Sequence, residues 1–213
     1  MWFLQGKEHM NKDSVVVIKS INYSEADKVL VVFGKNFGKY SIFAKGIRKI
    51  ESKNRGNMQT LWTSNISFYE GKGMPVLTES ELVNSIDYDS NSLDIKNAER
   101  ILFLLNHLLE EYDPYPDVYD LLQSVLNKQL SLESVNKFRI KFLKEAGFLQ
   151  DWSVCHKCGN KDVKYIDFNN FALICENCYS NKDKLEKIGK DLYRSESFAK
   201  VLDRYVKKIA EEI

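Results

Sequence analysis

The sequence contains few of the residues that interrupt or disorder a chain. Of its 213 residues, 3 are proline and 10 are glycine, whereas 44% are hydrophobic and 29% are charged. This composition excludes collagen-like, low-complexity and disordered chains, and it predicts a folded protein with a sizeable core. No run approaches the roughly 18 apolar residues of a membrane-spanning helix, so no membrane partner is expected. Residues 1–9 do not have the pattern of an export signal, and Met10 could equally be the natural start.

Histidine is also scarce, which limits the catalytic sites that the chain could build. Only His9, His107 and His156 are present, and a Ser-His-Asp or Cys-His site would have to be built from His107. That residue falls within an apolar helical run, which favours a helix histidine with a local partner. The sequence has neither an HExxH motif nor a glycine-rich phosphate loop, and its acidic residues between 110 and 120 are typical of an exposed helix junction. The sequence therefore predicts a protein that is not an enzyme.

The first third of the chain has the pattern of short β-strands. Runs rich in β-branched and aromatic residues, separated by polar or glycine-containing turns, predict strands at 14–21, 28–33, 39–46, 62–69 and 74–78. Five short strands without an intervening helical period suit a small antiparallel barrel, and the OB-fold is the commonest five-stranded choice. Another small barrel or roll is the alternative.

The periodicity changes after the strands. Apolar residues recur at intervals of three and four, which predicts helices over 95–109, 116–126, 131–147 and 195–212. Pro116 suits the first turn of the second helix, Ser131 the N-cap of the third, and Gly147 its end. Either Ser195 or Ser197 can cap the last helix. The chain is therefore predicted to continue from the barrel into a helical part.

Charge is unevenly distributed, although the formal net charge is only +1. Residues 34–55 contain seven cations against the single acid Glu51, and three aromatic residues lie among them. This combination is typical of nucleic-acid-binding barrels, in which cations follow the phosphates and rings stack on bases. The alternative is that the rings belong to the barrel core and the lysines to an ordinary solvated face. The candidate DNA-binding residues are Lys35, Lys39, Lys45, Arg48, Lys49, Lys53 and Arg55, with Phe37, Tyr40 and Phe43 as candidate stacking rings.

All 4 cysteines lie in one window as two C-x-x-C pairs, Cys155/Cys158 and Cys175/Cys178, with 16 residues between the pairs. Each pair can present two sulfurs to one face of a metal ion, and two pairs complete a tetrahedron. The residues between them suit a short hairpin, with strands at 164–168 and 171–174 around Asn169-Asn170, which tolerate the positive φ of a tight turn. Two disulfides or an iron–sulfur cluster are the alternatives, but without an export signal this spacing favours Zn²⁺. Four thiolates leave no open coordination position, so the zinc is expected to be structural.

Several short segments resemble those of one protein family. In the barrel region these are Ala44-Lys45-Gly46-Ile47-Arg48-Lys49, Ser52, Met58-Gln59, Glu79 and Glu81. Further along, residues 142–148 (FLKEAGF) lead into Cys155-x-x-Cys158-Gly159. C-x-x-C pairs alone occur in many families. Together and in this order, from about residue 14 to the C-terminus, the segments resemble the bacterial recombination mediator family RecO.

This resemblance implies a fold class and a division into domains. The implied fold class is α+β, with an N-terminal five-stranded OB-fold β-barrel followed by an α-helical domain that carries an inserted four-Cys zinc module. The implied domains are an OB-fold DNA-binding domain at 10–85, the first part of a helical domain at 86–152, the Cys₄ zinc module at 153–181, and a C-terminal helix at 182–213 that packs on the helical domain.

The resemblance also implies a function. A RecO protein would be a non-enzymatic DNA-repair mediator in the bacterial cytoplasm, associated with the nucleoid. It would bind single- and double-stranded DNA and anneal complementary strands. It would act with RecR, and with single-strand-binding protein through that protein's C-terminal tail, in loading RecA. A zinc-stabilised protein-interaction adaptor without direct DNA contact is the alternative.

Overall fold

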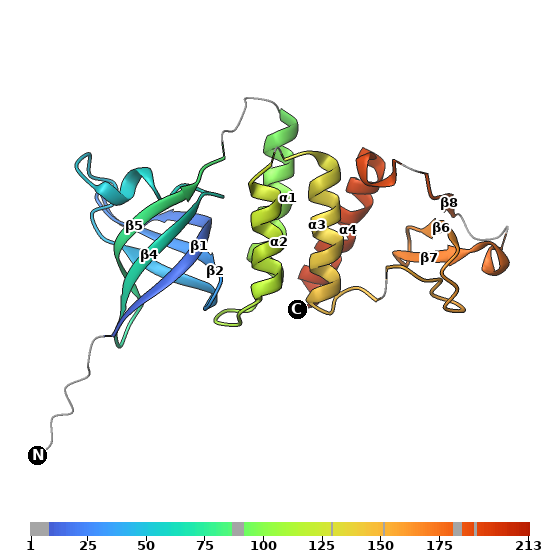
Figure 1. The fold of residues 1–213 in the computed structure, drawn as a ribbon, viewed down its shortest axis with the longest axis horizontal. Helices are drawn as coiled ribbons and strands as arrows, with labels where there is room; N and C mark the ends of the chain where they lie inside the picture. Colours follow the sequence, from blue (N-terminus) through green and yellow to red (C-terminus); the bar gives the residue numbers. More distant parts are fainter. Residues whose placement is uncertain (1–8, 87–91, 129, 151, 181–184, 190) are drawn as a thin grey trace, which may run out of the picture. The chain divides into compact units, whose positions relative to one another are not determined.

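The computed structural model describes residues 9–86, 92–128, 130–150, 152–180, 185–189 and 191–213 (Figure 1). The chain divides into two compact units, residues 1–129 and residues 130–213. The predicted helical domain at 86–152 is therefore shared between the two units, and the predicted boundary at 181/182 lies outside the described residues. The elements are β1 (His9–Asn22), β2 (Lys28–Gly34), β3 (Gly38–Ala44), η1 (Lys53–Gly56), β4 (Thr63–Glu70), β5 (Val76–Asn84), α1 (Ser92–Leu108), α2 (Pro116–Leu126), α3 (Leu132–Glu145), β6 (Val163–Asp167), β7 (Ala172–Cys175), η2 (Glu176–Cys178), β8 (Glu186–Lys187), η3 (Leu192–Arg194) and α4 (Glu196–Glu212).

The first five strands form a closed barrel in the order β1-β2-β3-β5-β4. β3 and β5 run parallel, and the other neighbours are antiparallel. This is the strand order of an OB-fold, so the predicted barrel class is confirmed. One irregularity in β1, between Val17 and Lys19, bends this long strand so that it pairs with both β2 and β4. The barrel core contains Val15, Val17, Leu30, Val32, Tyr40, Ile42, Ala44, Ile47, Met58, Ile66, Phe68 and Leu77.

Most strand ends differ from the prediction, three of them notably. β1 begins at His9 instead of residue 14, β3 ends at Ala44, and β5 continues to Asn84. The added residues of β1 and β5 are mostly polar, so composition alone does not mark them as strand. Their backbone groups pair with β4, which holds them in the sheet regardless of intrinsic propensity.

Part of the outer barrel surface is apolar and covered by helices of the same unit. Val16, Ile18 and Phe33 are almost completely buried, although none of them belongs to the barrel core. The ring of Tyr119 in α2 lies 5.7 Å from that of Phe33, centroid to centroid. The side-chain amide of Asn106 in α1 donates to the carbonyl of Ile18 at 3.1 Å. This part of the outer barrel surface is therefore shielded from solvent by α1 and α2.

The second unit combines two helices with a small sheet of order β7-β6-β8. The hydroxyl of Ser131 accepts from Ser134 N at 3.2 Å, and that of Ser195 accepts from Phe198 N at 3.3 Å, so Ser195 and not Ser197 is the cap of α4. Gly147 follows α3 with φ +78°, as expected of a glycine that ends a helix. Within the described residues, no helix is long and apolar enough to cross a bilayer.

The turn of the cysteine hairpin differs from the prediction. The positive φ falls on Phe171, at +47°, instead of on the two asparagines. The carboxylate of Asp167 accepts from the backbone N–H groups of Asn169 and Asn170 at 2.9 and 3.2 Å. These bonds hold both asparagines in the turn at negative φ, and the left-handed backbone conformation falls on the following residue, Phe171. The buried ring of Phe171 offsets the strain of that conformation.

Candidate metal centre and nucleic-acid interface

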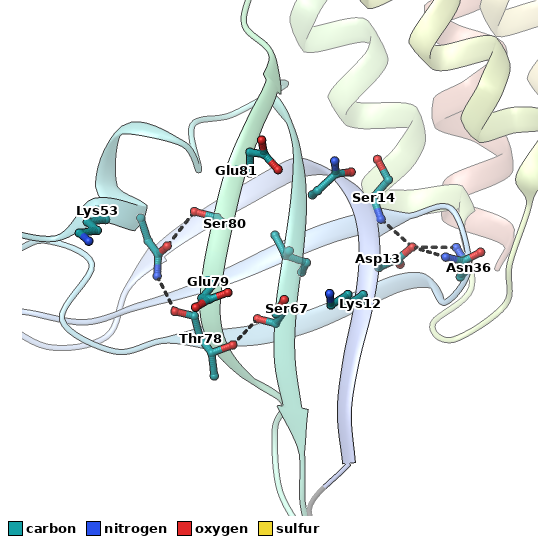
Figure 2. Close-up of a pocket in the computed structure, with 13 residues that line it drawn as sticks. Lys12, Asp13, Ser14, Asn36, Lys53, Ser67, Thr78, Glu79, Ser80 and Glu81 are labelled. Carbon is teal, nitrogen blue, oxygen red and sulfur yellow. Dashed lines mark hydrogen bonds between the residues drawn. The ribbon is translucent and has the colours of Figure 1, made fainter.

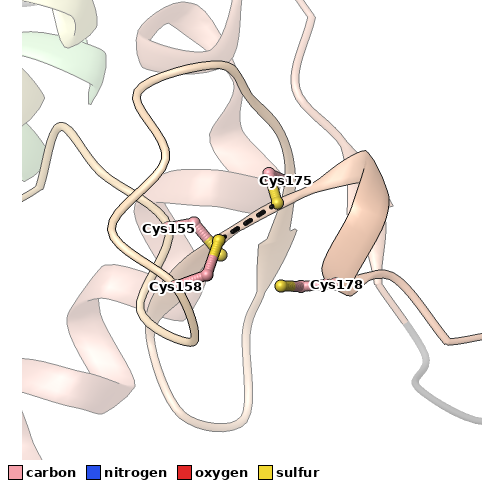
Figure 3. A group of neighbouring side chains, drawn as sticks. All are labelled: Cys155, Cys158, Cys175 and Cys178. Atoms are coloured by element: carbon pink, nitrogen blue, oxygen red, sulfur yellow. Dashed lines mark hydrogen bonds between the residues drawn. The ribbon is translucent and has the colours of Figure 1, made fainter.

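Four cysteine side chains of the second unit converge on one point (Figure 3). Their sulfur atoms all lie within 4.8 Å of one another, and the Sγ atoms of Cys158 and Cys175 are 3.6 Å apart. All four cysteines are free thiols, so the disulfide alternative does not hold. A tetrahedron with Zn–S bonds of about 2.3 Å has sulfur–sulfur edges of about 3.8 Å, close to this arrangement. The predicted ligands Cys155, Cys158, Cys175 and Cys178 are therefore brought together and could hold a metal ion.

Backbone hydrogen bonds shape the two cysteine-bearing turns. Gly159 N donates to Cys155 O at 2.8 Å, and Cys155 N donates to Asn160 O at 2.7 Å. Gly159 has φ +74°, a conformation that favours glycine and lets the chain turn back beside the first pair. In the second turn, Tyr179 N donates to Glu176 O at 3.2 Å and closes η2. Each pair is thus held with both sulfurs on the same side.

The thiol chemistry of the cluster favours a bound cation. Burial opposes the thiolate of Cys155, but hydrogen bonds from the backbone at Cys175, Lys157 and Cys158 lower its pKa to about 6. The sulfurs of Cys158 and Cys175 raise the pKa of Cys178 to about 12. Four adjacent thiolates repel one another, so full deprotonation needs a positive ion among them.

Stacked rings join the cysteine hairpin to α4 within the second unit. The ring of Phe171 stacks on Trp152 at a centroid distance of 4.6 Å and on Tyr205 of α4 at 4.5 Å. The hydroxyl of Tyr205 donates to the carbonyl of Phe148 at 2.8 Å. An ion that closes the cysteine cluster would therefore also fix the hairpin that carries Phe171.

The predicted DNA-binding residues of the barrel are divided between two places. Lys35 Nζ lies 2.7 Å from a carboxylate oxygen of Asp120 in α2. Lys39 Nζ donates to the carbonyl of Asn106 at 3.1 Å, and burial lowers the pKa of Lys39. These two cations face the helices of the first unit. Both are therefore partnered by groups of the same unit, Lys35 in a surface ion pair and Lys39 at a partly buried carbonyl.

Two of the three candidate rings also point inward. Tyr40 is 1% exposed, and its hydroxyl lies 3.4 Å from Asp13 Oδ2 inside the barrel. Phe37 is half-buried against the same core. Tyr40 offers no open face to a base, so the core alternative describes it better. Phe37 packs edge-on against Tyr40 and Phe68 and remains partly exposed. Phe43 points outward, and its ring meets that of Tyr23 edge-on at 5.4 Å.

The other five predicted cations lie together in the connection between β3 and β4. All five are exposed: Lys45, Arg48, Lys49, Lys53 and Arg55. In the part of the chain that the structure describes, Lys45, Lys49, Lys53 and Arg55 have no carboxylate at ion-pair distance. The guanidinium of Arg48 donates to the carbonyl of Ser24 at 2.6 Å, and Arg48 N donates to Ala26 O at 2.9 Å. The start of this segment, which we call the basic loop (residues 45–55), is therefore held against the turn between β1 and β2.

Asp27 connects that turn to the basic loop. Its carboxylate accepts from Gly46 N at 2.7 Å and from the Ser24 hydroxyl at 2.8 Å. These two hydrogen bonds, with the nearby charges of Lys45 and Lys49, lower the pKa of Asp27. The carboxylate remains ionised at neutral pH and orders both segments, so the basic loop begins in a defined conformation.

A polar groove of about 940 Å³ crosses the outer surface of β1, β4 and β5 beside η1 (Figure 2). Lys12 and Lys53 line it together with Glu79 and Glu81 of β5. The side chain of Asn54 donates to Thr78 O at 3.3 Å and accepts from the Ser80 hydroxyl at 2.8 Å, which holds η1 along β5. Because the carboxylates of Asp13, Glu79 and Glu81 outnumber the two lysines along the groove, it does not attract a polyanion as strongly as residues 45–49 do.

Comparison with known proteins identifies the family. The sequence profile described as "Recombination protein O N terminal" matches residues 10–86, and "Recombination protein O C terminal" matches residues 98–200. A DNA repair protein RecO from Acetivibrio thermocellus is 31% identical over 206 residues, which cover 92% of this chain and 78% of the relative. The chain belongs to the RecO family. The RecO proteins of Clostridium novyi and Mycoplasma mycoides are 27% and 28% identical, over 78% and 77% of this chain and 68% and 70% of their own lengths. The predicted resemblance is thus confirmed, and the family is one of DNA repair proteins.

Two residues of this RecO protein were not singled out from the sequence. Tyr23 and Asp27 lie in the segment 22–27, which the sequence describes only as a polar turn. The loop between the first two strands of an OB-fold borders its usual ligand-binding face. The position of Tyr23, an aromatic residue in that loop, could therefore have marked it as a candidate binding residue from the sequence alone. No sequence signal marks Asp27, because its role depends on the hydrogen bond from Gly46, which follows the neighbouring strand β3.

Proposed function

We propose that this RecO-family chain is a non-enzymatic, DNA-binding and strand-annealing mediator. It binds single- and double-stranded DNA and acts with RecR and with the C-terminal tail of single-strand-binding protein in loading RecA during DNA repair. Such a role belongs to the bacterial cytoplasm, at the nucleoid. The observation that carries the proposal is the exposed basic loop, whose cations Lys45 and Lys49 have no carboxylate at ion-pair distance among the described residues.

The mechanism rests on charge neutralisation. Cations of the basic loop bind phosphates and release condensed counterions, which lowers the repulsion between two DNA strands held by the same surface. The strands can then search for complementary pairing without an energy source. His107 supports the non-enzymatic reading, since it stacks on Phe103 and its Nδ1 lies 2.8 Å from the Phe103 carbonyl.

The metal has a structural part in this proposal. Cys155, Cys158, Cys175 and Cys178 hold a Zn²⁺ ion, and four thiolate ligands leave no position for water or substrate. The ion closes the cysteine hairpin and thereby stabilises the second unit.

Charge reversal in the basic loop tests the proposal. For a single strand, each phosphate contact changes the logarithm of the affinity by about 0.7 per tenfold change in salt concentration. Three contacts therefore contribute about a hundredfold at 0.1 M salt, relative to 1 M salt. We expect the triple variant Lys45→Glu/Arg48→Glu/Lys49→Glu to bind single-stranded DNA at least a hundredfold more weakly at 0.1 M salt. The slope of log affinity against log salt concentration should become shallower by about 2. The measurement is fluorescence anisotropy of a labelled oligonucleotide at two salt concentrations.

A matched variant controls for net charge. Lys200, Arg204 and Lys207 are exposed on α4 of the second unit, so their triple replacement by Glu changes the net charge equally. Reduced DNA binding in the loop variant alone supports the proposal. A wild-type affinity that does not respond to salt contradicts it and favours the alternative, an adaptor that only presents surfaces to other proteins.

A further inference from the structure

The four cysteines of the cluster differ in their access to solvent. Cys155 and Cys175 are each 1% exposed, and Cys178 is half-buried. Cys158 is exposed, and so are its neighbours in residues 156–160. A small oxidant in solution can therefore reach the Cys158 sulfur without displacing a packed side chain. Because oxidation of a thiolate depends on exposure, Cys158 should react before the buried sulfurs.

A second sulfur lies within reach of Cys158. The Sγ atoms of Cys158 and Cys175 are 3.6 Å apart (Figure 3). A disulfide bond is about 2.05 Å long, so the two sulfurs have to approach each other by about 1.5 Å. The backbone already joins the two segments, since His156 N donates to Leu173 O at 2.9 Å. Rotation of the two side chains can therefore close the bond without refolding either segment.

We propose that Cys158 is a site of oxidation by hydrogen peroxide, with Cys175 as the resolving thiol and a Cys158–Cys175 disulfide as the product. The inference goes beyond the proposed function, because it assigns a chemical reactivity to side chains that otherwise have only a structural part. It concerns the thiols of the second unit and does not involve the basic loop.

The reaction balances in two steps. The Cys158 thiolate attacks one oxygen of hydrogen peroxide, the O–O bond breaks and hydroxide leaves, so that Cys158 becomes a sulfenic acid. The Cys175 thiolate then attacks the Cys158 sulfur, the S–O bond breaks, and a second hydroxide leaves as the disulfide forms. Both hydroxides take protons from solvent and become water. The two thiolates together give up two electrons, and the peroxide is reduced by the same two electrons.

The disulfide leaves only two thiolates in the cluster, Cys155 and Cys178. Structural zinc sites in proteins have four ligands, so two thiolates are too few to retain the ion that the cluster could hold. Oxidation of one pair of sulfurs should therefore release a bound ion, one for each disulfide formed.

The oxidised hairpin should differ from one that has only lost its ion, because the disulfide ties the first cysteine turn to β7. The hydrogen bond from His156 N to Leu173 O lies in the linked segments and should persist. Cys178, at the end of η2, has no partner in this disulfide. The bond from Tyr179 N to Glu176 O, which closes η2 at 3.2 Å, then loses its anchor. In hydrogen exchange, we expect the His156 amide to keep its protection and the Tyr179 amide to lose it.

Mapping of the disulfide in the wild-type full chain tests the assignment. All 4 cysteines lie in the cluster, so every thiol that is lost comes from it. After one equivalent of hydrogen peroxide, we expect two of the four thiols to disappear and the mass to fall by about 2 Da. Cleavage after Lys157 and after Glu176 separates the members of each C-x-x-C pair, so the peptides of Cys158 and Cys175 should be recovered linked. Dithiothreitol should restore all four thiols.

Three results of this experiment would overturn the proposal. The first is a disulfide within a pair, Cys155–Cys158 or Cys175–Cys178. The second is a disulfide that joins the pairs without Cys158. The third is oxidised methionine with four intact thiols, which would show that peroxide does not reach the cluster.

The order of thiol reactivity gives an independent measurement. A brief pulse of N-ethylmaleimide on the wild-type protein should label Cys158 roughly tenfold faster than Cys155 or Cys175, and equal labelling would refute the assignment. In Cys175→Ser, which removes the resolving thiol, dimedone should trap the sulfenic acid on Cys158. A folded Cys175→Ser protein without the adduct contradicts the proposal. The wild-type map decides the matter where this variant does not fold.

This inference and the proposed function fail in distinguishable ways. The barrel contains no cysteine, so the oxidised protein should bind an oligonucleotide with the affinity of the reduced protein. Four intact thiols after peroxide treatment refute the role of Cys158 and leave the proposed function standing. If the purified protein contains no metal, the structural zinc fails, while the disulfide map still decides whether Cys158 and Cys175 react.

Discussion

Asp27 is an acidic residue at the edge of a surface that should bind a polyanion. Its carboxylate accepts from Gly46 N and from the Ser24 hydroxyl, and so joins the turn at 22–28 to the basic loop. Charge alone predicts that its removal strengthens DNA binding, since a negative group disappears beside Lys45 and Lys49. Its hydrogen bonds predict the opposite. Without them the basic loop loses its order, and ordering the loop again when DNA binds costs free energy.

We expect the hydrogen bonds to dominate. Asp27→Ala should weaken oligonucleotide binding by roughly fivefold, measured by anisotropy at low salt. Glu25→Ala is the control: Glu25 is exposed in the same turn, without a hydrogen bond or ion pair among the described residues, and its removal should strengthen binding slightly. Tighter binding by Asp27→Ala than by Glu25→Ala would mean that Asp27 acts only through its charge.

The lowered pKa of Asp27 also fixes the direction of a pH effect. The folded pKa lies below the ordinary value of 3.8, chiefly because of the hydrogen bond from Gly46 N. The stabilisation is therefore fully present above the unfolded pKa and is lost as the pH falls through the lower, folded value. The protection of the Gly46 amide from exchange, relative to the unfolded chain at the same pH, should fall only in strongly acidic buffer.

Among the secondary-structure elements, the cysteine hairpin shows how packing can override local preference. The asparagines at 169 and 170 suit a left-handed backbone, yet Phe171 adopts it. Its ring stacks on Trp152 and Tyr205, and these contacts exist only when α4 is packed against the hairpin. A turn assigned from composition alone cannot include them.

Phe171 should accordingly be among the most sensitive positions of the second unit. Its ring is 3% exposed, and replacement of such a residue by Ala costs about 3–5 kcal/mol of folding free energy. We expect Phe171→Ala to lower the thermal midpoint of the second unit by well over ten degrees, since each 1 kcal/mol lowers that of a domain of this size by about 4–8 °C. Phe168→Ala, at a half-buried position of the same turn, should have a smaller effect. Equal shifts in calorimetry would contradict the stacked-ring account.

At the scale of the whole molecule, the two compact units should respond differently to metal removal. Zinc bound by four thiolates contributes directly to the folding of small modules. After chelation, we expect the amides of β6 and β7 to lose protection in hydrogen exchange, while those of β1–β5 keep theirs. DNA affinity of the barrel should remain. Unchanged protection in β6 and β7 would show that the aromatic packing holds the hairpin without an ion.

The local pattern of the chain was sufficient for much of the fold. Strand composition predicted the five-stranded barrel, Ser131 marked the start of α3, and the C-x-x-C spacing predicted the convergent sulfurs. For α4 the sequence offered Ser195 or Ser197, and the structure selects Ser195. Each of these features depends on residues that are close in sequence or on a fixed ligand geometry. Sequence alone can therefore encode them.

The sequence by itself determined where cations and rings are concentrated, and the tertiary structure decided which of them are free. Lys35 and Lys45 look equivalent in the chain, yet Lys35 pairs with Asp120 and Lys45 remains exposed. Tyr40 is enclosed by the core, whereas Tyr23 is open. Availability to a ligand depends on what packs against each side chain. For Lys35 and Lys39 that partner comes from α2 and α1, more than 60 residues further along the chain.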